Sequence, residues 1–168
     1  TGGRAILHTD ELTYSVTGNA NEPVLAGGVL ESYNRLAQAL LFAIRELGLP
    51  VQIKEYTGEM NSQNLNPVCF EVPSTYEITV NEKKLIGSAQ AHKKEGVLQH
   101  GSLPLTGDLT RICQALVFKD EAAREGAAKR LLTRATTVES VLGVETDWET
   151  AAQAFVKGFE AQLGINFQ

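Results

Sequence analysis

The chain of 168 residues carries a formal net charge of −5, and 43% of its residues are hydrophobic and 21% charged, as in an ordinary globular domain. The acidic balance argues against a general nucleic-acid-binding role, and no apolar run reaches membrane-spanning length. Nothing at the start resembles a signal peptide, so we expect a cytoplasmic protein. Its two cysteines fit reduced thiols better than a disulfide framework.

The first third of the chain predicts two strands and one long helix. Residues 5–8 and 12–16 have the character of strands, with a turn between them. Apolar side chains then recur three and four apart over residues 29–47, before Gly48 and Pro50. This spacing predicts an amphipathic helix that packs on a sheet. A short strand at residues 51–56 is expected to follow it.

Residues 66–102 concentrate the reactive groups of the chain. Cys69 lies between two prolines, in a segment that neither a helix nor a central strand would accept easily, which indicates a loop. Alternating apolar and polar residues at 76–80 predict a half-buried strand, and the chain is expected to turn at Asn81 and Glu82. It then returns through Lys84, and residues 97–105 predict the next strand.

Small residues interrupt both of these later strands. Gly87, Ser88 and Ala89 form one run, and residues 100–102 place a glycine and a serine in the next strand. Such a run usually marks close approach of the backbone to a ligand or to another strand. We favour a ligand.

A cysteine nucleophile needs a partner that stabilises its thiolate. A lysine brought near Cys69 by strand pairing would lower the pKa of that thiol. Only one of Lys83 and Lys84 is expected to face the site, because neighbours on a strand point to opposite faces. We expect Lys84 on the face that carries Ile86, or at the rim of that face.

The last third of the chain predicts helices. Asp108 is expected to cap the first of them, and two candidate capping boxes pair Thr136 with Glu139 and Thr146 with Glu149. The predicted helices cover residues 109–116, 121–132 and 148–163. Residues 108–168 would then form a helical C-terminal part of the same domain.

Several conspicuous side chains have plain structural interpretations. Cys113 lies on an apolar stripe and reads as a buried structural thiol, because free cysteine behaves as a small hydrophobe. Trp148 is expected to be a packing residue and His92 to be exposed to solvent. Neither His92 nor the other two histidines, His8 and His100, cluster with acidic residues at metal-ligand spacing, so no metal site is predicted.

Five motifs together resemble those of the lipoate/biotin protein ligase superfamily, in particular its octanoyltransferase branch that uses a cysteine in this loop. In chain order they are TGGRAILH, ELTYSV, PVCFEVPSTYE, KKLIGSAQ and LQHGS. The resemblance covers Thr1 to about Leu116 well and the remainder loosely. It implies an α+β fold, a mixed, mostly antiparallel sheet flanked by helices, in a single catalytic domain over residues 1–168. It also implies that an N-terminal portion of the family's sheet is lacking.

The resemblance implies an acyl transfer in two steps, with no cofactor. Cys69 would take octanoate from octanoyl-acyl carrier protein, and a lysine of a lipoyl domain, similar to the glycine cleavage H protein, would then accept it. One alternative of the same fold is a lipoate-protein ligase that uses ATP and magnesium. Another is an amidotransferase that moves octanoate between lipoyl domains. From a different class, the chain would be a non-catalytic binder of lipoylated domains.

The resemblance also assigns site residues. The family pattern K-[LIV]-x-G gives Lys84 the role of holding the acyl carbonyl, beside the nucleophile Cys69. Two N-terminal glycines and an arginine offer N–H groups and a guanidinium suited to a carbonyl or phosphate, although a tight turn explains the glycines equally well. His100 either lines the site or makes a structural hydrogen bond. The expected substrate-binding residues are Gly2, Gly3, Arg4, His8, Gly87, Ser88, Ala89, His100 and Gly101.

Overall fold

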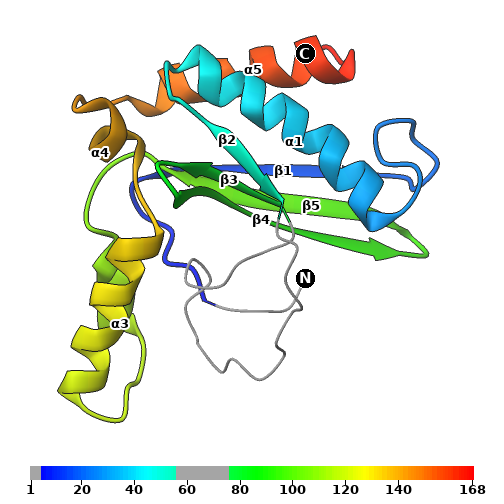
Figure 1. Cartoon of the computed structure of the whole chain (residues 1–168). Coiled ribbons are helices and arrows are strands. Elements are labelled where there is room, and N and C mark those ends of the chain that lie inside the picture. The colour runs from blue at the N-terminus through cyan, green and yellow to red at the C-terminus, as the bar shows by residue number, and fades with distance from the viewer. Residues whose placement is uncertain (1–4, 56–75) are drawn as a thin grey trace.

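An antiparallel sheet organises the part of the chain that the computed structural model describes, residues 5–55 and 76–168. Within these residues five strands pair in the order β1-β5-β4-β3-β2 (Figure 1). The strands are β1 (Glu11–Gly18), β2 (Gln52–Glu55), β3 (Tyr76–Val80), β4 (Lys83–Lys93) and β5 (Gly96–Pro104). Among the described residues all four strand pairs are antiparallel, and a parallel bridge joins Lys84 to Ala135. The expected mixed, mostly antiparallel sheet is confirmed.

Two long helices cover one face of this sheet, and α3 lies at one end of it (Figure 1). The helices are α1 (Val29–Glu46), the 3₁₀ helix η2 (Leu109–Arg111), α2 (Ile112–Ala115), α3 (Glu121–Arg134), α4 (Val138–Leu142) and α5 (Trp148–Leu163). The apolar stripe of α1 carries Leu36, Leu40 and Ile44, which are buried in one core with Leu85 of β4 and Phe155 of α5. The amphipathic spacing therefore predicted the packing of α1 correctly.

The predicted turn between β3 and β4 is also confirmed. Asn81 and Glu82 both adopt positive φ angles, 48° and 64°. Two consecutive residues of this kind form the tight hairpin turn whose twist matches that of the flanking strands. The turn brings β4 back along β3 and so places Lys84 at the second position of β4.

Two helix caps lie one residue beyond their predicted positions. Asp147, not Thr146, caps α5, and its carboxylate accepts a first-turn N–H at 2.8 Å. Thr137, not Thr136, caps α4. The N–H of Thr136 donates instead to the carbonyl oxygen of Lys84 at 3.1 Å, which holds this residue beside the sheet.

Three further predictions are wrong. The first predicted strand is not formed. Ala5 makes only an isolated bridge, and Ile6 packs against the apolar cluster formed by α2 and α3. Trp148 is 57% exposed and lines a groove of ≈ 740 Å³ between β1 and α5. His92 is half-buried rather than exposed, and its Nε2 lies 3.1 Å from the hydroxyl of Ser32 on α1.

Candidate active site

A β-bulge decides which face of the sheet Lys84 joins. Ile78 pairs with Ile86, and both belong to the core on the helix side. The next pair is Thr79 with Lys84, so Leu85 is an extra residue in β4. Paired residues share a face and neighbours alternate, so Lys84 lies on the face opposite to Ile86. The expectation that Lys84 shares the face or rim of Ile86 is therefore wrong.

The backbone around Lys84 is held from both sides. Lys84 pairs with Thr79 in β3, and on its other side its carbonyl oxygen accepts the N–H of Thr136. The side chain of Lys84 is buried, with only 4% of the residue exposed. Lys83 pairs with the core residue Val80, so the two lysines point to opposite faces, as predicted.

The residues that follow Lys84 on its face are small. Gly87 and Ala89 come next in β4, and their partners in β5 are Ser102 and His100. Gly87 and Ser102 are buried, Ala89 is half-buried and His100 is exposed. We call these five residues, Lys84, Gly87, Ala89, His100 and Ser102, the lysine face. On this face the buried side chain of Lys84 is followed by Gly87 and Ala89, whose side chains cover little of the β4 backbone.

Ser102 is the member of the lysine face that the sequence reasoning missed. Its residue exposure is 0%, and its hydroxyl oxygen has no hydrogen-bond partner in the part of the chain that the structure describes. A signal was present in the sequence, because Ser102 follows His100 by two positions in the motif LQHGS. On a strand this spacing places both side chains on one face.

Ser88 and Gly101 lie on the helix side of the sheet. The hydroxyl of Ser88 is 2.6 Å from the phenol oxygen of Tyr14, and the side-chain amide of Gln99 donates to the same oxygen at 2.9 Å. Burial raises the pKa of Tyr14, although both hydrogen bonds act to lower it. A Cβ atom on Gly101 would lie 2.7 Å from the Tyr14 ring and 2.8 Å from the Ser88 hydroxyl. The glycine thus makes room for this polar cluster, and substrate contact by Ser88 and Gly101 stays a prediction.

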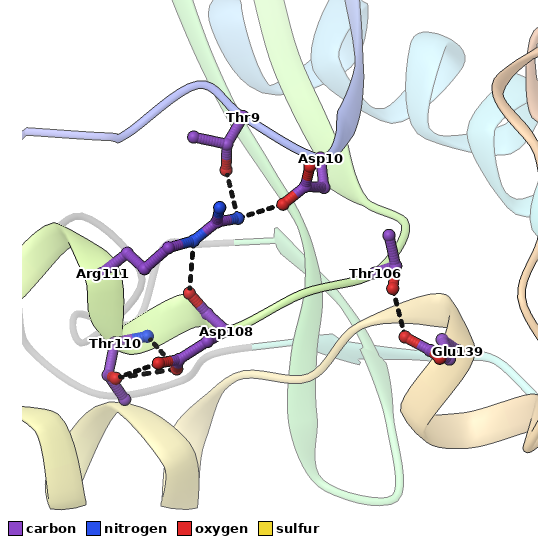
Figure 2. A network of polar contacts seen from close by, with 7 residues as sticks. All are labelled: Thr9, Asp10, Thr106, Asp108, Thr110, Arg111 and Glu139. Carbon is purple, nitrogen blue, oxygen red and sulfur yellow. Dashed lines mark hydrogen bonds and ion pairs between the residues drawn. The ribbon is translucent and has the colours of Figure 1, made fainter.

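A second polar network fixes the segment before β1 (Figure 2). Arg111 donates to the hydroxyl of Thr9 at 2.9 Å and pairs with the carboxylate of Asp10. Nearby, the hydroxyl of Thr106 donates to Glu139 of α4, so this glutamate binds a loop rather than completing the predicted capping box. The network joins the start of β1 to the end of β5 and to α4.

The remaining predicted residues are placed differently. The side chain of His8 is 61% exposed, and its ring contacts the carboxylate of Glu11. The predicted residues that lie outside the described residues are Gly2, Gly3, Arg4 and Cys69. Within the described ranges, no group of three or more histidine, cysteine or acidic side chains is arranged to hold a metal ion. No helix in those ranges is long and apolar enough to cross a membrane.

Curated proteins resemble the chain over nearly all of its length. The octanoyltransferase LipM of Moorella thermoacetica is 39% identical over 167 residues, which make up 99% of this chain and 61% of that relative. The octanoyltransferase LipM of Carboxydothermus hydrogenoformans is 37% identical with the same two coverages. The chain therefore spans 61% of the length of these relatives.

Solved structures confirm the fold. A bi-partite lipoate protein ligase from Thermoplasma acidophilum matches with a TM-score of 0.69 and 24% identity, over 95% of this chain and 53% of that one. The family model that describes the lipoyl protein ligase A/B catalytic domain matches residues 1–160. Because this match covers nearly the whole sequence, the chain belongs to the lipoyl protein ligase A/B catalytic domain family.

Proposed function

We propose that the chain is an octanoyltransferase that acts in protein lipoylation. The observation that carries the proposal is the position of Lys84, which a bulge turns away from the core and onto a face of small residues. Two curated relatives named octanoyltransferase, 39% and 37% identical to the chain, support octanoyl transfer as the reaction. Cys69 is the proposed nucleophile and Lys84 holds the acyl carbonyl.

The proposed reaction has two acyl transfers. The Cys69 thiolate attacks the thioester carbon of octanoyl-acyl carrier protein, a new carbon–sulfur bond forms, and the carrier thiol leaves with a proton. The ε-amine of an acceptor lysine then attacks the acyl-enzyme, an amide forms, and the Cys69 thiol is released. The first step exchanges one thioester for another and the second runs downhill to an amide. The proposed reaction therefore uses neither ATP nor a metal.

Lys84 serves both steps by stabilising negative charge. In each transfer the acyl carbonyl oxygen becomes an oxyanion, and a cation held beside it lowers the barrier. Backbone N–H groups near Gly87 are further candidate donors. A buried lysine suits this role because electrostatic attraction is stronger where water is excluded.

The proposed partners follow from the reaction. Octanoyl-acyl carrier protein is the donor, and a lipoyl domain such as the glycine cleavage H protein is the acceptor. The solved Thermoplasma ligase was studied together with an E2 lipoyl domain, which supports an acceptor of this class. The cytoplasm stays the predicted location.

Intact-protein mass spectrometry tests the proposal. The parent chain is mixed with octanoyl-acyl carrier protein in the absence of ATP, beside Cys69→Ala and Cys113→Ala variants. Cys113 is buried and only 2% exposed, so its variant is a matched control that keeps one cysteine.

We expect one octanoyl adduct on the parent and on the Cys113→Ala variant, none on the Cys69→Ala variant, and its discharge by an apo H protein. An octanoyl product that forms only with ATP would instead support the ligase. The absence of any product with or without ATP would leave a binding module.

A further inference from the structure

Ser102 is a buried hydroxyl whose hydrogen bonds are not accounted for. The residue has no exposed surface, and its Oγ has no partner in the described part of the chain. Burying a hydroxyl without a hydrogen bond costs free energy, so a buried and unpaired hydroxyl in a native structure calls for an explanation. Gln99, on the opposite face of β5, is fully buried as well, yet its side-chain amide donates to Tyr14.

The position of Ser102 points to the lysine face. Ser102 pairs directly with Gly87 of β4 and with Thr13 of β1. Gly87 has no side chain, so nothing from that neighbour covers the hydroxyl. Lys84 precedes Gly87 on the same face of β4. The two residues are three positions apart, but Leu85 is the extra residue of the bulge, so they still point to the same side. One such step along a strand is about 7 Å, which a lysine side chain can span.

We propose that the Ser102 hydroxyl donates a hydrogen bond to the acyl carbonyl oxygen of the bound substrate, opposite to Lys84. The proposal rests on the octanoyl transfer described above and adds a substrate-binding residue to it. The ligand is a fatty-acyl thioester whose carbonyl lies over Gly87, which contributes no side chain to this face. Two donors from different strands then converge on one oxygen, which is the arrangement that stabilises an oxyanion.

This assignment gives the Ser102 hydroxyl a partner, which it lacks among the described residues. The carbonyl oxygen of the bound acyl group accepts its hydrogen bond. The hydrogen bond strengthens as charge develops on the oxygen, so its loss slows the chemical step more than it weakens binding of the donor.

Single-turnover acylation of Ser102→Ala tests the proposal, with Ser15→Ala as the matched control. Ser15 lies on the same face in β1, opposite His100, but is exposed, so water satisfies its hydroxyl. We expect Ser102→Ala to form the acyl-enzyme about tenfold more slowly at saturating donor, which corresponds to about 1.4 kcal/mol. Its KM and Tm should stay near those of the parent, Ser15→Ala should keep the parent rate, and Ser102→Thr, which retains the hydroxyl, should recover most of it.

Two results would overturn the assignment while the parent still forms its acyl adduct. One is a Ser102→Ala variant that reacts at the parent rate. The other is a marked loss of stability in Ser102→Ala, which would assign the hydroxyl to the fold. A parent chain that forms no adduct would overturn the octanoyl transfer itself, and with it this role of Ser102.

Discussion

Replacement of Gly158 by alanine should destabilise the protein, although alanine is the better helix former. Gly158 lies in α5 where this helix crosses α1. A Cβ atom there would lie well inside van der Waals contact of the Ala39 carbonyl oxygen, 3.1 Å from the Ala43 nitrogen and 3.2 Å from its Cβ. Alanine gains about 1 kcal/mol over glycine within a helix. Overpacking of a close-packed core costs about 1–3 kcal/mol, and the upper end applies because two of the obstructing atoms belong to a helix backbone.

The expected net effect is a loss of about 1–2 kcal/mol in the free energy of unfolding. For a chain of this size that corresponds to a fall in Tm of about 2–8 °C. Gly126 of α3 is the matched control, because a Cβ there would meet only the flexible end of Arg130, at 3.3 Å. Gly126→Ala should therefore raise Tm, by about 2–4 °C.

Thermal unfolding of both variants, followed by circular dichroism, measures the two effects. The opposite signs are the essential result, since the same substitution is made in two helices. A Gly158→Ala variant as stable as the parent would refute the close contact between α1 and α5.

Two other predictions follow from single contacts. Asp147 accepts hydrogen bonds from Thr150, which lowers its pKa, so its contribution to stability is present above about pH 4 and is lost as the pH falls through the lowered pKa. The variant Asp147→Asn keeps a capping oxygen but does not titrate, so it should lose less stability than the parent between pH 5 and pH 3. Urea midpoints at the two pH values measure this, and an equal loss in both proteins would contradict it. Tyr14→Phe removes the phenol oxygen that bonds Ser88 and Gln99 and should cost about 1–3 kcal/mol of unfolding free energy. Unchanged urea unfolding of this variant would show that the cluster adds no stability.

Local patterns predicted most of the fold, because the residues that carry them act over short distances. The spacing of apolar residues located α1, and the polar pair Asn81 and Glu82 located the turn before β4. The predicted cap of α4, Thr136, lies one residue before the observed cap, because the N–H of Thr136 donates to the carbonyl oxygen of Lys84. That contact joins segments far apart in the sequence, and no local pattern reveals it.

The side of the sheet on which Lys84 lies could not be derived from alternation. Strict alternation places Lys84 with Ile86, and a single extra residue reverses that result. The adjacent apolar pair of Leu85 and Ile86 was the available signal, since two neighbours that both enter the core break the period of two. The resemblance to a family singled out Lys84 as a site residue, which stays a prediction, whereas the reason for its orientation emerged only from the register of β3 and β4.

The most direct test of the account compares Lys84→Met with Lys83→Met. The two lysines are neighbours in sequence, but Lys84 is buried on the lysine face and Lys83 pairs with a core residue on the other side. The measurement is the rate of acyl-enzyme formation from octanoyl-acyl carrier protein in a single turnover. The account predicts a loss of about 100-fold or more for Lys84→Met, as for removal of an oxyanion donor, and a rate near that of the parent for Lys83→Met. Equal rates for the two variants would contradict it.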